Sequence, residues 1–199
     1  ILIFGNTGFV GSWLSIALDL LDVKILGVSL KMSNQNYISN TSQFRKKIKT
    51  VYCDINNLDK IKNTIINFKP EIVIHLASQP IVQKGFENPK ETFSTNIFGS
   101  IKIFEMIRKI SSIKKIVIFT SDKVYQNDFK TLNEKSSLGG LDPYSASKSC
   151  QDIISQSYNF SFFKKKMVLI RSGNIIGGGD WGQNRLLPDI IKAFRNKQK

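Results

Sequence analysis

Short apolar runs alternate with helical segments along almost the whole chain, and this alternation limits the possible folds more than any other feature. The first run, residues 1–4, is continuously apolar, as in strands that are buried on both faces of a sheet. Strands that alternate with helices predict βαβ units, a parallel sheet and right-handed crossovers. The predicted fold class is therefore α/β, with a doubly wound parallel sheet.

The expected elements follow from the same periodicity. Strands are predicted over residues 1–4, 23–30, 50–54, 71–76, 115–120 and 167–171. Helices are predicted over residues 10–21, 58–68, 89–110, 144–160 and 187–196, and the Ser- and Asn-rich segment 31–43 is predicted as a loop. From Gly173 onward a Gly-rich loop replaces the alternation. We therefore expect a sheet domain over 1–172 and the truncated start of a smaller region over 173–199.

Three glycines with G-x-x-G-x-x-G spacing join the first predicted strand to the first helix. Gly5 permits a tight turn, Gly8 lets the backbone approach a pyrophosphate, and Gly11 lets the helix pack closely on the strand. The start of the helix supplies N–H groups and a positive dipole end to phosphates. This context predicts a dinucleotide site, whose loop contacts we assign to Gly5, Thr7, Gly8, Phe9 and Gly11.

The sequence predicts a dinucleotide site but leaves the choice between NAD and NADP open. An acidic residue that hydrogen-bonds the ribose hydroxyl of NAD is expected after the second strand, but the chain has Ser29-Leu30-Lys31 there. Lys31 either favours the extra phosphate of NADP or is a plain surface lysine. Asp54, which follows the third strand, suits the adenine edge and suits a helix N-cap equally well.

A tyrosine and a lysine share one face of the predicted helix 144–160. Asp142 and Pro143 suit the N-cap and first position of this helix, and Lys148 lies four residues after Tyr144. A nearby ammonium favours the phenolate of a tyrosine. The pair predicts a base that deprotonates an alcohol during hydride removal, with the Ser121 hydroxyl facing the same point from a strand end.

These motifs resemble those of the extended short-chain dehydrogenase/reductases. The residues that carry the resemblance are Gly5 to Gly11, His75-Leu76-Ala77, Asn96, Thr120-Ser121, and Tyr144 to Lys148. Within that family the chain is most similar to the CDP-glucose 4,6-dehydratase branch, through Ser121-Asp122-Lys123 and the stretch Gly177 to Trp181. The resemblance implies a Rossmann-type dinucleotide-binding domain, NAD as cofactor and a nucleotide sugar, CDP-glucose, as substrate.

The resemblance also implies a set of site residues. The catalytic set is Ser121, Asp122, Lys123, Tyr144 and Lys148. The cofactor-binding set beyond the glycine loop is Asp54, Ile55, Leu76, Ala77, Asn96, Thr120, Tyr144 and Lys148. The substrate-binding set is Gln79, Ser121, Asn174, Arg185 and Leu186, in which the Arg185 guanidinium suits a diphosphate.

The implied reaction is a dehydration of the sugar. Tyr144 takes the proton of the 4-hydroxyl while C4 gives hydride to NAD; the 4-ketone then acidifies the C5 proton, water leaves from C5 and C6, and the hydride returns to C6. Asp122 is implied as the acid for the departing 6-hydroxyl. Other sugar-nucleotide 4,6-dehydratases carry a glutamate at the position of Lys123, so the C5 base stays unassigned, and an uncharged lysine tuned by burial is one alternative.

Composition narrows the other functional classes. The formal net charge of +14 comes mostly from lysines without interleaved aromatic residues, so we expect a solvated surface and no nucleic-acid partner. One histidine and two cysteines suggest neither a metal site nor a disulfide framework, and His75 is expected to be packed. No apolar run approaches the roughly 20 residues of a membrane span, and we see no leader, so the cytoplasm is the expected compartment.

The sequence leaves alternative functions open and gives one expectation about the oligomeric state. The same fold could carry an epimerase or a dTDP-glucose or GDP-mannose dehydratase, against which Asp122 and Lys123 argue. It could also serve a non-catalytic dinucleotide sensor, against which the complete Ser121, Tyr144 and Lys148 set argues. A basic RNA-binding protein is a further alternative, against which the lack of aromatic residues beside the lysines argues. The resemblance implies a homodimer or higher homo-oligomer built on two helices. An apolar stripe in the first of them either pairs with a second copy or faces the sheet: Ile97, Ile101, Phe104 and Ile107.

Overall fold

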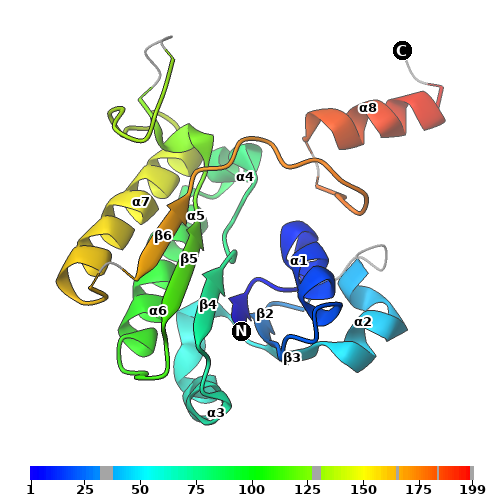
Figure 1. Ribbon diagram of the computed structural model, residues 1–199. Helices are drawn as coiled ribbons and strands as arrows, with labels where there is room; N and C mark the ends of the chain where they lie inside the picture. Colours follow the sequence, from blue (N-terminus) through cyan, green and yellow to red (C-terminus); the bar gives the residue numbers. More distant parts are fainter. Residues whose placement is uncertain (32–37, 127–130, 165, 183, 198–199) are drawn as a thin grey trace.

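A sheet of six parallel strands runs through the centre of the protein (Figure 1). The computed structural model describes residues 1–31, 38–126, 131–164, 166–182 and 184–197. The strands are β1 (Leu2–Phe4), β2 (Leu26–Ser29), β3 (Lys49–Tyr52), β4 (Ile72–His75), β5 (Lys115–Phe119) and β6 (Met167–Ile170). Their order across the sheet is β3-β2-β1-β4-β5-β6, which confirms the predicted doubly wound topology.

Strand β1 lies at the centre because it is apolar on both faces. Leu2 is in register with Leu26 of β2 on one side and with Val73 of β4 on the other. All three residues of β1 have no exposed surface. The chain order reverses between β1 and β4, and in open α/β sheets ligands bind at the carboxyl ends of the strands at such a reversal.

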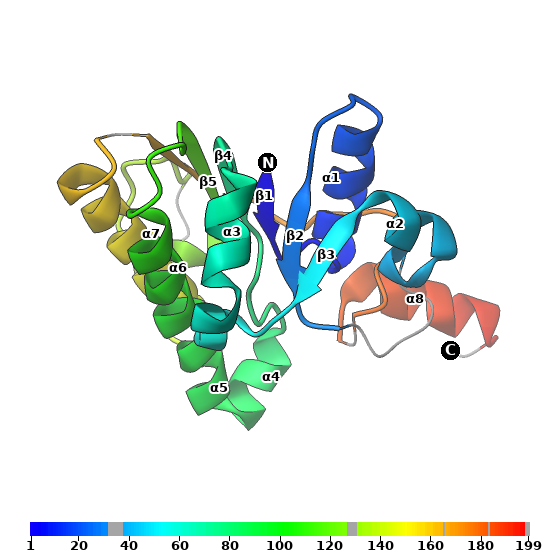
Figure 2. The same cartoon turned by 90° about the horizontal axis from the view of Figure 1, so that it is seen from below.

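Helices cover both faces of this sheet (Figure 2). Helices α1 (Phe9–Asp19) and α2 (Ser42–Lys47) cover one face, over a small core that includes Ile3, Ile25 and Ile74. Helices α3 (Lys62–Phe68), α6 (Ser100–Ile107) and α7 (Pro143–Ser161) cover the other face, over the larger core. The central strands β1, β2 and β4 are therefore shielded from water on both sides, whereas the edge strands β3 and β6 keep exposed residues such as Tyr52 and Val168.

The single helix predicted over 89–110 is divided into three parts. Helix α5 (Pro89–Phe93) leads into a π-helical segment, η3 (Ser94–Gly99), and then into α6. Two features lie in the π-helical segment: the side chain of Asn96 is fully buried, and a Cβ at Gly99 would lie 2.5 Å from Ile55 Cδ1. Segments of this kind occur frequently at functional sites.

Several short elements fall outside the predicted helices and strands. The predicted loop over 31–43 holds the 3-10 turn η1 (Ile38–Asn40) and the start of α2, while residues 32–37 lie outside the described residues. Helix α4 (Val82–Glu87) and the 3-10 element η4 (Asp122–Val124) were also not predicted. The helix predicted over 58–68 is divided between the end of the 3-10 element η2 (Ile55–Ile61) and helix α3. Helix α2 buries Phe44 and exposes most of its other residues, so it has too few apolar positions to show a period.

The proposed outer stripe on the helix 89–110 is wrong for two of its four residues. Phe104 and Ile107 are at most 1% exposed and belong to the larger core, so this part of the stripe faces the sheet. Ile97 and Ile101 are half-buried. The spacing alone identified an apolar face but could not tell which partner covers it.

The last described segment differs from the rest of the fold. After β6 the chain runs without regular structure to α8 (Leu186–Arg195), which contains no buried residue and lies apart from the sheet (Figure 1). The connecting loop is held at the start of α1, where Trp13 Nε1 donates to the Gly178 carbonyl at 2.8 Å. The domain boundary at residue 173 stays a prediction. Among the described residues no helix is both long and apolar enough to cross a membrane.

Candidate active site

The glycine loop after β1 is closely packed except at Gly8. Gly5 has φ +89°, and a Cβ there would lie 2.7 Å from Ala77 N. A Cβ at Gly11 would lie 2.1 Å from the Gly5 carbonyl oxygen, which confirms the close helix packing. A Cβ at Gly8 would meet only that same oxygen, at 3.5 Å, and Gly8 caps α1 without a side-chain hydrogen bond. The loop is therefore open at Gly8, where a phosphate group fits.

Buried polar side chains fix this loop to β2 and β3. Thr7 Oγ1 lies 2.7 Å from Ser29 Oγ, and Thr7 is 2% exposed. Asn6, which the sequence analysis did not identify, is fully buried and donates to Thr50 Oγ1 at 2.8 Å. Its side chain occupies the space that a Cβ at Gly27 would need. Thr7 thus shapes the loop from inside, whereas Phe9 is half-buried and Lys31 is exposed.

Asp54 has the N-cap role that was one of its two predicted roles. Its Oδ1 accepts from Asn56 N at 2.8 Å at the start of η2, and Asp54 is exposed. Ile55, next in the chain, is buried in the larger core. The contact of Asp54 with adenine stays a prediction.

The loop after β4 is held by two amide side chains. Asn96 Oδ1 accepts from Gln79 N at 2.8 Å, and Asn96 Nδ2 donates to Ser147 Oγ of α7 at 2.8 Å. The side chain of Gln79 donates to Thr92 Oγ1 at 2.9 Å and accepts from Ile81 N at 2.6 Å. Both residues therefore fix the loop that contains Leu76 and Ala77, and their contacts with ligands stay predictions.

Tyr144 and Ser121 meet at the carboxyl end of β5. Asp142 caps α7 through its bond from Ser145 N at 3.0 Å, and Pro143 is the first helical residue, as predicted. The Ser121 side chain interacts with the Tyr144 phenol, and the tyrosine is 8% exposed. Burial raises the pKa of Tyr144, while Ser121 and the positive charge of Arg185 act to lower it. Burial is therefore the largest influence on the phenol, and the effect of Lys148 on it stays a prediction.

Lys148 lies deeper in the protein than its partner. It is 3% exposed, and its Nζ donates to Gln151 Oε1 at 2.9 Å and to the Phe119 carbonyl at 3.4 Å. Burial lowers the pKa of Lys148 to about 7. At neutral pH its ammonium and amine forms are therefore both populated.

The two residues after Ser121 are open to solvent. Asp122 Oδ1 lies 3.0 Å from Ser121 Oγ, so Ser121 joins the phenol to this carboxylate. Lys123 is also exposed. The burial that a tuned Lys123 would require is therefore not observed, and this interpretation is wrong for the structure described.

Of the three substrate residues predicted beyond β6, one has an electrostatic influence on the phenol. Arg185 acts electrostatically on Tyr144, and its Nη1 forms an ion pair of 2.9 Å with Asp180 Oδ2. Asn174 is exposed, and Leu186 is 75% exposed. Thr120, predicted near the cofactor, is 6% exposed and lies 3.3 Å from the buried Asp152 carboxylate.

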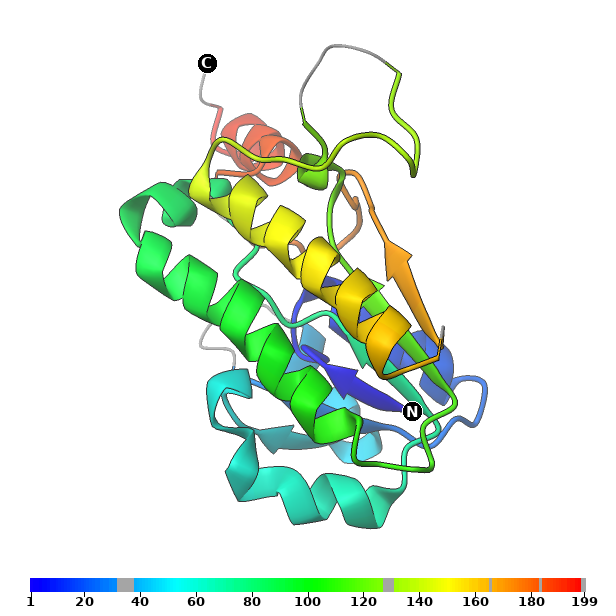
Figure 3. The same ribbon diagram turned by 90° about the vertical axis from the view of Figure 1, so that its left-hand side faces the viewer.

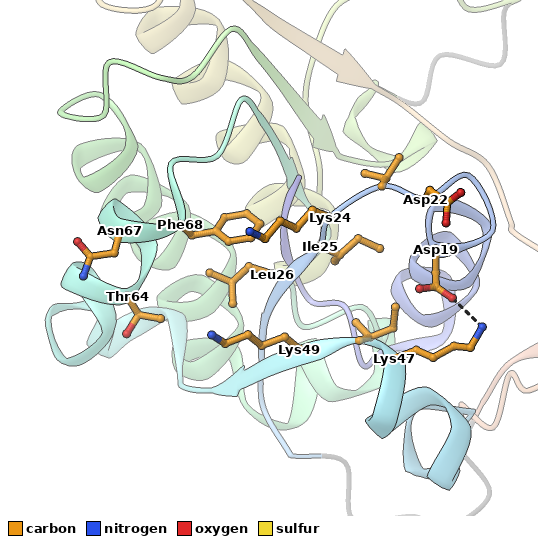
Figure 4. Close-up of a pocket in the computed structure, with 12 residues that line it drawn as sticks. Asp19, Asp22, Lys24, Ile25, Leu26, Lys47, Lys49, Thr64, Asn67 and Phe68 are labelled. Atoms are coloured by element: carbon orange, nitrogen blue, oxygen red, sulfur yellow. Dashed lines mark ion pairs between the residues drawn. The ribbon is translucent and has the colours of Figure 1, made fainter.

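A separate hollow of about 700 Å³ lies at the opposite edge of the sheet (Figure 4). Its lining includes Lys24, Lys49 and Phe68 near the amino ends of β2 and β3, and Lys47 is paired with Asp19 at 3.2 Å. None of the predicted site residues lines it. The candidate active site is the edge with the carboxyl ends of β1, β4 and β5.

The strand order and the glycine loop define a Rossmann-type domain. The family model described as GDP-mannose 4,6 dehydratase matches residues 2–177, and the chain belongs to this family. The protein is 36% identical to a CDP-glucose 4,6-dehydratase of Salmonella typhimurium over 100% of this chain and 58% of the relative. It is 30% identical to a dTDP-D-glucose 4,6-dehydratase of Dictyostelium discoideum over 100% of this chain and 49% of that relative.

Solved structures agree on the fold. A UDP-glucose 4-epimerase of Thermotoga maritima with UDP-glucose superposes with a TM-score of 0.86 at 20% identity, over 100% of this chain and 63% of that one. A dTDP-glucose 4,6-dehydratase of Bacillus anthracis in complex with NAD gives 0.81 at 21% identity, over 100% and 62%. At these identities the likeness shows the fold alone.

Proposed function

We propose that the protein is an NAD-dependent nucleotide-sugar 4,6-dehydratase that converts CDP-glucose into CDP-4-keto-6-deoxyglucose and water. The observation that carries the proposal is the contact of Tyr144 with Ser121 and of Ser121 with Asp122, at the sheet edge that also carries the glycine loop. This arrangement supplies a base for the 4-hydroxyl and an acid for the 6-hydroxyl within one cluster. The 36% identity to a CDP-glucose 4,6-dehydratase supports the substrate.

The residues around the glycine loop fit a dinucleotide. Gly5 and Gly11 have no room for a Cβ, whereas Gly8 is open toward the first turn of α1. Gly8, Thr7 and Phe9 would hold the pyrophosphate, and Asp54 would meet the adenine. When bound, NAD supplies a hydride acceptor for C4 and then a hydride donor for C6.

Each protein group then has a defined task. Tyr144 removes the proton of the 4-hydroxyl as the C4 hydride leaves, and Ser121 orients the same hydroxyl. Asp122 donates a proton to the 6-hydroxyl, so that this group departs as water when the C5 proton is removed. Arg185, whose charge acts on the phenol, provides a positive charge for the diphosphate end of the substrate. The base at C5 has no assignment.

The test is product analysis with CDP-glucose and NAD. The wild type should form a 6-deoxy product, and Tyr144→Phe should lower turnover at least a thousandfold because the phenol is the general base. Asp122→Asn should accumulate reduced cofactor and form little product, because oxidation needs Tyr144 and elimination needs the acid. Tyr158→Phe is the matched control, since Tyr158 is on the same helix and donates to the half-buried Glu105, away from Tyr144.

Three results would each contradict the proposal or a part of it. Formation of a C4 epimer without any 6-deoxy sugar would indicate an epimerase. Normal product formation by Asp122→Asn would remove Asp122 as the acid. A non-catalytic sensor would bind NAD and form neither product.

We also propose that the protein forms a homodimer through α7 and the π-helical segment beside it. These helices lie next to each other on one face of the molecule (Figure 3). Large apolar side chains are exposed on that face: Phe98 is 60%, Ile153 is 53% and Phe160 is 82% exposed. These three side chains form the proposed dimer surface in place of the predicted stripe, because Phe104 and Ile107 of that stripe face the sheet.

A further inference from the structure

A chain of buried polar groups lies behind Lys148. Gln151, one turn further along α7, has no exposed surface. Its Oε1 accepts from Lys148 Nζ at 2.9 Å, and its Nε2 donates to Ser100 Oγ of α6 at 2.9 Å. The Lys148 ammonium is thus connected through Gln151 to a second helix.

Ser100 and His75 determine which way the Gln151 amide faces. Ser100 Oγ donates its single hydrogen to the Asn96 carbonyl at 2.7 Å, so it can only accept from its other neighbours. One of these is His75 Nε2 at 2.9 Å, which on this assignment carries the ring hydrogen. Gln151 Nε2, 3.3 Å from the same ring nitrogen, is then a neighbour and not a donor to it. His75 Nδ1 has no hydrogen-bond partner among the described residues. The other neighbour of Ser100 Oγ is Gln151, whose nitrogen must face Ser100. The amide oxygen is consequently directed at Lys148.

We infer that Gln151 is a positioning residue for Lys148, an inference whose catalytic meaning rests on the proposed function. Gln151 Oε1 and the Phe119 carbonyl take two of the three ammonium hydrogens and leave one for the cofactor cleft. Four elements, α6, α7, β4 and β5, contribute to this arrangement. A lysine held in this way loses its rotamer freedom before ligands bind.

It also matters for Lys148 that the side chain of Gln151 is uncharged. A carboxylate at this place would pair with Lys148 and hold it protonated, whereas an amide supplies a hydrogen bond without a counter-charge. The titratable groups around Lys148 are His75 of β4, whose pKa burial lowers to about 3, and Tyr144 of α7. Asp122, Asp142 and Arg185 act on the phenol. Lys148 therefore stays able to exchange its proton near neutral pH.

The test is a titration of Lys148 by NMR on the protein with ¹³C-labelled lysine side chains, without substrate. Lys148→Arg identifies the signal, since ordinary lysines titrate near pH ~10.4. Gln151→Leu should weaken proton binding by Lys148 about tenfold or more, because the ammonium loses an acceptor. Gln151→Glu should strengthen it at least about tenfold. Gln83→Leu, the same change at an exposed position of α4, should leave it unaltered.

Activity gives a second readout that a purely structural role would not move. In Gln151→Leu the midpoint of C4 oxidation should shift to higher pH, because an uncharged lysine no longer favours the phenolate. Circular dichroism checks folding, and if Gln151→Leu does not fold, the nearly isosteric Gln151→Glu carries the test. Unchanged Lys148 titration in the folded Gln151 variants would overturn the inference. Shifted titration without conversion of CDP-glucose would instead overturn the proposed function alone.

Discussion

Two glycines of the same loop are expected to have different tasks: Gly11 is needed for the fold, whereas Gly8 is needed for cofactor binding. Gly8 and Gly11 belong to the same motif, but only Gly11 touches the backbone of the turn closely enough to exclude a methyl group. Gly8 has φ −69° and ψ 175°, which any L-residue can adopt. Alanine at these two positions should therefore have different consequences.

We expect Gly11→Ala to destabilise the fold and Gly8→Ala to weaken cofactor binding. The added Cβ at position 11 would overlap the Gly5 carbonyl, so the loop must shift at a cost of about 1–3 kcal/mol in unfolding free energy. Urea unfolding measures this cost. Gly8→Ala should unfold like the wild type but bind NAD at least tenfold more weakly by calorimetry. Equal NAD affinity in Gly8→Ala and wild type would contradict the assigned role.

His75 makes the free energy of unfolding depend on pH. Burial, and to a lesser degree Lys148, lowers its pKa to about 3, while in the unfolded chain it titrates near ~6.5. The unfolded state therefore binds the proton first, and stability is lost as pH falls from about 6.5 toward 3, by at most about 1.4 kcal/mol per pH unit. His75→Gln should show a flatter decline in unfolding free energy over this range. The same pH dependence of the unfolding free energy in wild type and His75→Gln would show that His75 does not contribute to the acid sensitivity.

At the scale of elements, one buried ion pair joins α7 to β6. Asp152 is fully buried and receives two bonds from Arg171, at 2.8 and 2.9 Å. Arg171 also contacts the Tyr125 ring and donates to the Glu134 carbonyl in the loop before α7. The pair thus holds the helix that carries Tyr144 against the strand beside Ser121.

Removing one partner of this pair should be costly. Asp152→Ala leaves the Arg171 charge uncompensated and should lower the unfolding free energy by about 3–5 kcal/mol, measured by urea unfolding. Replacing both residues by leucine should restore part of this loss, because no buried charge remains. Glu71→Ala, which breaks an exposed ion pair with Lys114, should leave the unfolding midpoint nearly unchanged. A similar effect of both alanine variants would contradict the role of burial.

For the whole molecule, the two faces of the sheet have unequal outer surfaces. The exposed Phe98, Ile153 and Phe160 gather over α7 and the π-helical segment, whereas the face with α1 carries exposed Leu20 and Leu21 at the end of a single helix. An apolar surface that spans two adjacent helices is suited to a second copy of itself.

We expect a dimer by light scattering at micromolar concentration. Ile153→Lys should convert it to a monomer, because the interface would bury an unpaired charge. Leu21→Lys is the matched control, since Leu21 is 73% exposed at the end of α1, and it should remain dimeric. A monomeric wild type would count against the proposed surface.

Contiguous segments of the sequence were sufficient to predict the sheet, the glycine loop and the shared face of Tyr144 and Lys148. Each depends on spacing within a few residues: apolar runs for strands, three-residue steps between glycines, and four residues for one turn of a helix. The N-cap of α7 at Asp142 is equally local. The handedness of βαβ units then determines on which face of the sheet each connecting helix lies.

Only the tertiary structure decided which groups surround these residues. Ser100 and Gln151 are 51 positions apart, and His75 and Gln151 are 76 apart, so no local pattern links them. The same holds for the direction of Phe104 and for the exposure of Lys123, both of which the sequence left open. Burial is a property of the packed molecule, and it is burial that lowers the pKa of Lys148 to about 7 and raises that of Tyr144.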